Sequence, residues 1–422
     1  MSNRGELMKF GILSQWFDPE PGGGAIPGAL ARELQRRGHE VSVVTGFPNY
    51  PTGSIYPGFS MSLKQDYFDD GIALRRLALY PSHDASSLKR ILNYGSFAGN
   101  ASILGLPWLR GLDALWVYNS PASIALPMWA AKYFLKVPHV LHVLDLWPDS
   151  IYLSDFGARR PLPKLVRLGL DKWCKAMYQS ASSVAYVSPG IGTELALRGV
   201  PESKLRYVPV WADEVVSRST KSTDRVTWGV EKDELLILYA GAIGASQGLE
   251  SLIEGIDLVR DKVKVTCLIA GSGTSENSLR ELVTSRRLDN VHFLGQVSRD
   301  RMPQIANAAD LHVVTLRDYP LSSITMPSKI QTILASGKPF IAAVPGDARE
   351  AAMLSNAAFL ANPGDSQSIA DAIVLAAGVG AAKLSYMGQN GLSHYRRNYS
   401  LESGVDTIES LLISAATEKR LS

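Results

Sequence analysis

Short apolar runs alternate with amphipathic stretches along most of the chain. Two runs in the first part, Lys9–Ser14 and His39–Val44, are apolar enough for buried strands. Between them Leu30 and Leu34 lie at helical spacing among charged neighbours, up to Gly38. A strand, a helix and a second strand this close together predict a βαβ unit, whose crossover connection requires parallel strands.

The same alternation continues to residue 343 and is interrupted once. The predicted strands are short and rich in β-branched residues, as expected where both faces of a sheet are covered. They span 112–118, 139–144, 183–187, 235–239, 264–270, 291–294, 311–314 and 340–343, with helices at 122–135, 164–178, 249–259, 275–284, 301–308, 328–334 and 401–415. The interruption at Val208–Asp213, followed by the polar stretch 217–224, is typical of an interdomain linker.

Two successive runs of βα units predict an α/β fold of two Rossmann-like domains, each a doubly wound parallel sheet, that face a cleft. A chain of 422 residues also favours two domains over one. We expect the first domain to span residues 1–208 and the second 209–395. Residues 396–422 are expected to form a C-terminal helix that can pack back on the first domain.

Composition and charge narrow the class of protein. With 46% hydrophobic and 20% charged residues the chain is typical of a globular protein, and its two cysteines are expected to be free thiols of a reducing compartment. The start lacks the apolar core of a signal peptide, and no uninterrupted apolar run of about 18 residues occurs. We therefore expect a cytoplasmic protein. Basic residues outnumber acidic ones up to residue 210, which weakly favours an anionic partner there.

Glycines follow the first predicted strand. Glycine at Gly22, Gly23 and Gly24 lets the backbone approach a ligand, and the next helix offers free N–H groups to a phosphate. The glycines do not form the dinucleotide fingerprint, and no acidic residue ends the second strand to hold a ribose, so NAD binding is disfavoured. A plain flexible turn is the alternative.

Glycines also follow two strands of the second half. Gly241 and Gly244 come after one strand, and Gly271, Ser272 and Gly273 come after another. Open α/β sheets bind ligands at the carboxyl ends of their strands, so the two loops together favour a nucleotide-binding face. Each loop alone is also a common packing turn.

One lysine lies at the start of a predicted helix. Ser328 is a candidate N-cap, and Lys329 follows in the first turn. A cation there opposes the helix dipole unless an anion such as a diphosphate is nearby. A solvated lysine is the alternative.

Two carboxylates, Asp145 and Asp149, follow the strand that ends at Leu144. At that place they can orient a hydroxyl group or accept its proton. Alternatively, Asp149 caps the next helix and Asp145 makes hydrogen bonds within the loop.

A basic stretch predicts a two-faced helix near residues 164–178. Its apolar face is formed by Val166, Leu170, Trp173 and Met177. Its charged residues could lie on an anionic membrane surface, although a core-packed helix with a solvated face is the commoner explanation. The charged residues of the stretch are Arg159, Arg160, Lys164, Arg167, Lys172 and Lys175.

An ordered series of motifs gives the chain a resemblance to the retaining glycosyltransferases of family 4, which have the GT-B fold. It is most similar to the bacterial branch that builds capsule, colanic-acid-type and O-antigen (lipopolysaccharide) repeats, including N-acetylfucosaminyl transferases. The series covers nearly the whole chain: Leu30–Leu34 with Gly38–Val41, Pro48–Pro51, Leu141–Asp149, Val187–Gly190, Tyr239–Gly244, Ala270–Gly273, Pro327–Lys329 and Leu334–Pro339.

The resemblance implies a nucleotide-sugar donor in the second domain, an acceptor in the first, and transfer with retention, without a metal ion or other cofactor at the reaction centre. By carry-over, Gly23 and Gly24 approach the donor diphosphate, and Ser328 and Lys329 bind it. Asp145 would then lie near the acceptor hydroxyl.

The chain departs from the family pattern at four positions. The family's paired glutamates fall at Ile324 and Thr332, and Ile243 and Gln247 occupy the region of its usual Arg/Lys pair. The sugar and ribose contacts and the stabilisation of the leaving group are the functions that these departures affect.

We therefore predict transfer of a hexosyl or N-acetylhexosaminyl group from a UDP- or GDP-sugar to a polyprenyl-diphosphate-linked saccharide, with peripheral membrane contact and no nucleic acid. Asp145, Asp149 and Lys329 are the candidate catalytic residues. A nucleotide-sugar epimerase with paired Rossmann domains is one alternative. A catalytically degenerate binding subunit is another, which the missing glutamates favour and the retained Lys329 opposes.

Overall fold

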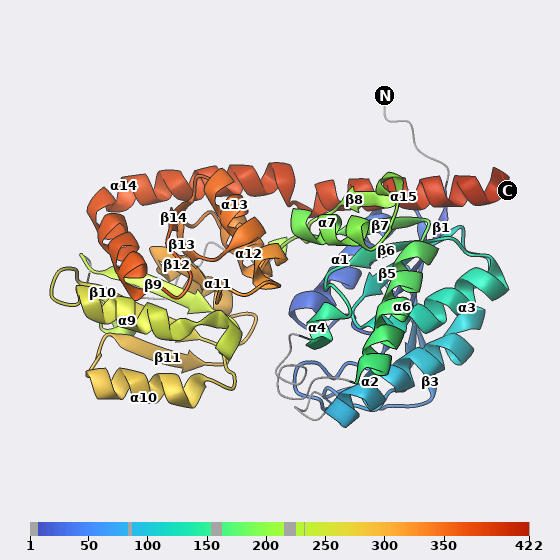
Figure 1. The fold of residues 1–422 in the computed structure, drawn as a ribbon, viewed down its shortest axis with the longest axis horizontal. Coiled ribbons are helices and arrows are strands. Elements are labelled where there is room, and N and C mark those ends of the chain that lie inside the picture. Colours follow the sequence, from blue (N-terminus) through green and yellow to red (C-terminus); the bar gives the residue numbers. More distant parts are fainter. Residues whose placement is uncertain (1–6, 83–86, 153–162, 215–224, 232, 422) are drawn as a thin grey trace. The chain divides into compact units, whose positions relative to one another are not determined.

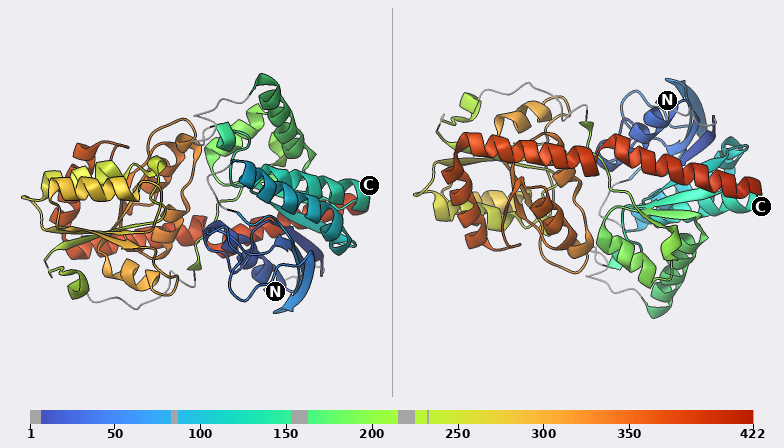
Figure 2. Two further views of the ribbon diagram at one scale, coloured as in Figure 1. Left: turned by 90° about the horizontal axis from the view of Figure 1, so that it is seen from below. Right: turned by 90° about the horizontal axis from the view of Figure 1, so that it is seen from above.

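The computed structural model describes residues 7–82, 87–152, 163–214, 225–231 and 233–421 (Figure 1). Contacts within the chain define two compact units: unit 1 is Met1–Pro209 with Leu401–Ser422, and unit 2 is Val210–Ser400. Each unit has one sheet flanked by helices (Figure 2). The predicted α/β class with two Rossmann-like sheets is confirmed.

The sheet of unit 1 has the strand order β3-β4-β2-β1-β5-β6-β7-β8, parallel except between β3 and β4. Phe10 of β1 pairs with Val41 of β2 on one side and with Ala114 of β5 on the other. The strands are β1 Lys9–Leu13, β2 Glu40–Gly46, β3 Lys64–Asp69, β4 Ile72–Leu77, β5 Ala114–Asn119, β6 His139–Val143, β7 Ser183–Tyr186 and β8 Leu205–Tyr207. The helices are α1 Ala25–Arg36, α2 Ser87–Asn100, α3 Ala125–Leu135, α4 Asp149–Tyr152, α6 Lys164–Ser180, α7 Pro189–Leu197 and α15 Leu401–Leu421.

An antiparallel hairpin at the edge of this sheet was not predicted. Strands β3 and β4 are joined by Asp70 and Gly71, which both have positive φ, 46° and 81°. Two successive residues with positive φ suit the type I′ turn, for which Asp-Gly is a preferred sequence. The dipeptide was therefore a sequence signal for this hairpin.

The sheet of unit 2 has the order β11-β10-β9-β12-β13-β14, and each adjacent pair is parallel. Its strands are β9 Leu235–Ala240, β10 Val265–Ala270, β11 Val291–Gly295, β12 Leu311–Thr315, β13 Phe340–Ala343 and β14 Ala358–Leu360. Its helices are α9 Leu249–Val259, α10 Glu276–Arg286, α11 Met302–Ala308, α12 Ser328–Ala335, α13 Gly346–Leu354 and α14 Ser366–Asn398.

Strand β9 shows why this sheet is apolar on both faces. Ile237 and Tyr239 belong to one core cluster together with side chains of α9 and α14. Leu236 and Leu238, which alternate with them, belong to another cluster with Ile305 of α11. Alternate residues of a strand point to opposite faces, so a strand covered by helices on both sides is apolar throughout.

Helix α14 was not predicted, and it is kinked. Gly380 interrupts it with φ 75° and ψ 162°, a conformation that favours glycine. The helical stretch Ser366–Leu421 contains an 18-residue window of mean hydropathy 1.4, of which 33% is buried, so by length and composition alone it could cross a membrane. Within this stretch Ile369, Ile373 and Ala376 pack into the core of unit 2.

Helix α15 extends beyond the predicted 401–415 to Leu421, and several polar contacts join it to the rest of unit 1, among them those of Glu409. Glu409 accepts hydrogen bonds from Arg37 Nη1 at 2.5 Å and from His39 Nε2 at 2.7 Å. Burial acts to raise the pKa of Glu409, but the hydrogen bonds from His39 and Arg37 outweigh it and lower the pKa.

Glu409→Gln is expected to destabilise the protein by about 1–3 kcal/mol at pH 7, because it removes the charge that Arg37 and His39 contact. A lowered carboxyl pKa stabilises the fold above the unfolded value of about 4.3, and this contribution is lost as the pH falls through the folded value. Urea unfolding at pH 7 and pH 3.5 measures the difference. Glu418→Gln, on the exposed side of the same helix, is the control; equal effects of both variants at pH 7 would contradict this account.

Candidate functional site

Two glycine loops contact each other at the carboxyl ends of β9 and β10. The N–H of Gly241 donates to Ala270 O at 2.9 Å, and the N–H of Ile243 donates to Ser272 O at 3.0 Å. A Cβ on Gly271 would lie 1.8 Å from Gly241 O, and one on Gly273 would lie 2.3 Å from Ile243 O. Packing between the loops therefore requires glycine at 271 and 273, and their role in donor binding stays a prediction.

Lys329 lies over the aromatic ring at the end of β9. Its Nζ donates to Tyr239 Oη at 2.5 Å and is 4.1 Å from the ring centroid. A Cβ on Gly241 would lie 2.3 Å from Lys329 Cε, so the glycine makes room for this side chain. Burial lowers the pKa of Lys329 to about 8. The alternative of a solvated lysine is therefore wrong.

The prediction that Ser328 caps α12 is also wrong. Pro327 occupies the N-cap position, no side chain caps the helix, and Ser328 is its exposed first residue. Ser328 nevertheless lines a cavity of about 190 Å³ with Lys329 and Thr332. Gly244 ends the loop after β9 and precedes the 3₁₀ turn Ala245–Gln247, where its N–H donates to Gln247 Oε1 at 3.1 Å.

In unit 1 the triglycine forms a short 3₁₀ turn, Gly22–Gly24, between β1 and α1. Gly22 has φ 63°, and an added Cβ there would meet nothing within 4 Å. A Cβ on Gly23 would lie 2.8 Å from Tyr118 Oη, whereas Gly24 is buried and its Cβ would lie 2.7 Å from Glu20 Cβ. Packing thus explains Gly24, and Gly22 and Gly23 are open to solvent.

Glu20, which the sequence did not single out, organises this end of the sheet. Its buried carboxylate accepts the N–H groups of Phe17 at 3.1 Å and of Asn49 and Tyr50 at 2.8 Å each. Burial raises the pKa of Glu20 despite these bonds and the nearby Arg76. Glu20 therefore joins the loop after β1 to the loop after β2. Buried glutamate is uncommon unless paired, but the sequence does not show which residues are buried.

The structure gives Asp145 and Asp149 different surroundings. Asp145 is exposed at one side and accepts a hydrogen bond from Ser120 Oγ at 3.0 Å; the surrounding protein desolvates its carboxyl group and raises the pKa, although the Ser120 hydrogen bond acts to lower it. Asp149 begins α4 and forms an ion pair with Arg198 at 2.5 Å. Asp145 is thus available to a ligand, and the contact of Asp149 is structural.

The basic helix is only partly as predicted. Met177 is buried, and Trp173 contacts Trp129 of α3 edge-on at 4.7 Å between ring centroids. Val166, assigned to the apolar face, is 48% exposed, and its neighbours from Lys164 to Gly169 in the first turns of α6 are exposed as well. Arg159 and Arg160 lie outside the described residues.

Comparison with protein families finds a matching domain family for each half of the chain. Residues 22–211 match the glycosyl transferase 4-like domain, and residues 234–377 match glycosyl transferases group 1. The chain is a GT-B glycosyltransferase of family 4. The alternatives of an epimerase and of a non-catalytic binding subunit are replaced by this assignment.

Known proteins are similar to this glycosyltransferase in sequence or in fold. The Escherichia coli K12 protein named "Putative colanic acid biosynthesis glycosyl transferase WcaI" is 25% identical over 78% of this chain and 82% of its own length. Sucrose-phosphate synthase from Thermosynechococcus elongatus has a TM-score of 0.72 at 17% identity, covering 96% of this chain and 98% of its own. Anabaena HepE, solved with UDP-glucose, has a TM-score of 0.68 at 17% identity, covering 96% and 100%.

The four positions at which this glycosyltransferase departs from its family have local roles in the structure. Ile243 is fully buried, and the side chain of Gln247 accepts the N–H of Gly244. Thr332 Oγ1 donates to Ser328 O at 3.0 Å, and Ile324 ends a 3₁₀ turn. Among the residues that line the cavity, only Lys329 has a positively charged side chain at neutral pH. The cavity also contains His312, but burial lowers the pKa of His312 to about 4.

Gly271→Ala is expected to destabilise the glycosyltransferase by about 3 kcal/mol or more, because its methyl group would overlap the carbonyl of Gly241 at a positive φ of 141°. Gly378→Ala, in the helical part of α14 with open space around it, should instead stabilise by up to about 1 kcal/mol. Chemical denaturation measures both. A Gly271→Ala protein as stable as the wild type would show that the loops do not pack as described.

Proposed function

We propose that this glycosyltransferase moves a hexosyl or N-acetylhexosaminyl group from a UDP- or GDP-sugar to a polyprenyl-diphosphate-linked saccharide during surface polysaccharide synthesis. The names of WcaI and of the Anabaena HepE complex with UDP-glucose support the pathway and the donor class. The donor is assigned to unit 2 and the acceptor to unit 1. N-acetylfucosaminyl transfer is one form of this reaction, and retention of the anomeric configuration is part of the proposal.

The observation that carries the proposal is the position of Lys329. A half-buried ammonium group with no carboxylate lining its cavity strongly favours an incoming anion, since burial leaves its charge poorly solvated. The donor diphosphate would supply that anion, and negative charge develops on it as the sugar departs. The ammonium group would stabilise this charge without a metal ion or cofactor.

On unit 1, Asp145 is proposed to position the acceptor hydroxyl. It is reachable by solvent and held by Ser120, and its raised pKa makes the carboxylate a stronger proton acceptor than an ordinary aspartate. Asp149 would support it indirectly, by fixing the loop through Arg198.

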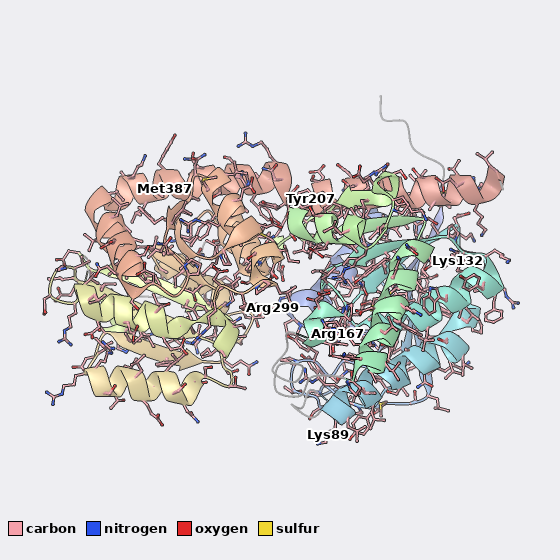
Figure 3. All side chains as sticks on the ribbon, viewed as in Figure 1. Lys89, Lys132, Arg167, Tyr207, Arg299 and Met387 are labelled. Atoms are coloured by element: carbon pink, nitrogen blue, oxygen red, sulfur yellow. The ribbon has the colours of Figure 1, made fainter. Side chains whose placement is uncertain are left out.

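Contact with an anionic membrane at the cytoplasmic face is proposed for the side of unit 1 that carries α2, α3 and α6. Helix α3 contacts α2 and α6 directly. The three helices expose Leu88 at 67%, Phe134 at 77% and Leu165 at 84%, with exposed basic residues among them; Lys89 and Arg167 are labelled in Figure 3. Exposed apolar side chains mixed with lysine and arginine suit a lipid headgroup region, where a lipid-linked acceptor would be found.

Lys329→Ala is expected to reduce kcat by about 100-fold or more, because it removes the charge that faces the leaving group. With a pKa of about 8, Lys329 should also make kcat/KM fall as the pH rises above 8, since the ammonium form is the active one. Lys329→Arg keeps its charge at every accessible pH and should remove this alkaline decline. Lys262→Ala, at an exposed lysine of unit 2, is the control.

The assay follows release of UDP or GDP from a panel of nucleotide sugars, with a lipid extract as acceptor. Product linkage by NMR reports retention. Near-normal turnover of Lys329→Ala, or an alkaline decline that persists in Lys329→Arg, would contradict the role of Lys329. Release of nucleotide without any saccharide product would contradict the proposed acceptor.

Reversing the charge of Arg167 and Lys175 on α6 is expected to weaken binding to phosphatidylglycerol vesicles by about tenfold at low salt, with the difference shrinking as salt screens the charges. Flotation of vesicles with bound protein measures this. Lys64→Glu on the edge strand β3 is the matched control, and the same loss with both variants would remove the α6 face from the proposal.

A further inference from the structure

A second cavity of unit 2 lies between α14 and the edge strand β14. Its volume is about 540 Å³. One wall is a single stripe of α14 beyond the kink, at the spacing of residues on one helix face. This stripe comprises Lys383, Tyr386, Met387, Asn390, His394 and Arg397; Met387 is labelled in Figure 3. The cavity shares no lining residue with the one around Lys329.

The opposite wall includes the outer edge of β14. Within the described strands, β14 pairs only with β13. Phe340 N–H donates to Ala357 O and Ala361 N–H donates to Ala342 O, each at 3.0 Å, so these groups face β13. Because backbone groups alternate along a parallel edge strand, the N–H groups of Ala358 and Leu360 point the other way, and both residues line the cavity. The wall thus offers backbone donors.

The cavity has a positive charge without a compensating carboxylate. Lys383 and Arg397 line it, no aspartate or glutamate does, and among the described residues neither cation has an ion-pair partner within 4 Å. Lys383 instead lies over the ring of Tyr386, 5.1 Å from its centroid. Burial and the charge of Arg397 lower the pKa of His394. By contrast, Arg286 in the same unit contacts both Glu254 and Asp257.

We propose that this cavity binds a phosphate group carried by a small molecule or a lipid headgroup. Two cations, backbone N–H groups and the side chains of Asn356 and Asn390 supply the donors that phosphate oxygens require. The volume lies in the range of small-molecule sites, roughly 300–1,000 Å³. β14 has only three residues, which is short for pairing with an added peptide strand, so a small anion fits this edge better.

The rim suits a phosphate that is attached to an apolar group. Leu354 is 56% exposed and Tyr386 is 60% exposed, and both line the cavity. An apolar substituent could cover these side chains while its phosphate reaches Lys383 and Arg397. The site is separate from the donor cavity, so it is independent of the proposed transfer reaction.

The test uses the full chain and inorganic phosphate, followed by calorimetry and by the imidazole resonances of His394. Wild type should bind phosphate and the His394 resonances should move. Lys383→Ala and Arg397→Ala should each weaken binding about tenfold, the loss of one charge-assisted hydrogen bond. Arg396→Ala, an exposed neighbour that does not line the cavity, is the control and should bind within twofold of wild type.

Two further arms identify the source of the phosphate. Glycerol 3-phosphate represents a soluble ligand, and phosphatidylglycerol vesicles, compared with phosphatidylcholine vesicles, represent a headgroup. Loss of either interaction in the Lys383 and Arg397 variants but not in Arg396→Ala supports the site. No binding of phosphate or vesicles, or equal binding by all variants, would overturn it. Sugar transfer should be unchanged in all three variants, which keeps this result separate from that of the transfer assay.

Discussion

The contact between the loops that follow β9 and β10 constrains the rest of unit 2. The two backbones approach so closely that a methyl group on Gly271 would overlap the carbonyl of Gly241. The same approach places Gly241 beneath Lys329, whose ammonium group reaches the hydroxyl of Tyr239. The cation is thereby fixed at the carboxyl end of a buried strand, where its charge is poorly solvated and an anion is favoured.

In unit 1 a buried carboxylate holds two loops together at the carboxyl ends of the strands. Three backbone N–H groups surround Glu20, so the loops after β1 and β2 have one common anchor next to the triglycine turn. Asp145, at the end of β6, remains open to solvent beside Ser120. Unit 2 thus presents a cation and unit 1 a carboxylate, the two groups that the proposed transfer assigns to the leaving diphosphate and to the incoming hydroxyl.

The architecture followed from the sequence because most strands are buried on both faces and amphipathic helices separate them along the chain. The antiparallel edge was missed although Asp70-Gly71 signals its turn, since β3 is largely exposed and lacks an apolar run. The kink of α14 depends on a single glycine, Gly380, in an otherwise helical pattern. One or two turn-forming residues do not change the periodicity of the surrounding sequence, so an analysis based on periodicity overlooks them.

The site was predicted in part, because sequence shows residue types but not partners distant along the chain. The position of Lys329 in the first turn was predictable, whereas its contact with Tyr239, ninety residues earlier, was not. The sequence favours Asp145 over Asp149 as the functional residue, but it does not show that Arg198 pairs with Asp149. Helix α12 begins at Ser328, the predicted first residue, so Pro327 and not Ser328 occupies the N-cap position. The sequence suggests that Gly273 lets the backbone approach a ligand, whereas in the structure the close contact with the loop at Ile243 explains why glycine is needed there.

The most direct test of the account is the protonation of Lys329 with and without nucleotide, measured by NMR on lysine-labelled full-length protein. In the free glycosyltransferase the group should titrate near 8. On saturation with UDP or GDP, whichever binds, a neighbouring diphosphate should raise this value by more than about one unit. Nucleotide binding that leaves the titration of Lys329 unchanged would contradict the claim that this lysine holds the donor diphosphate.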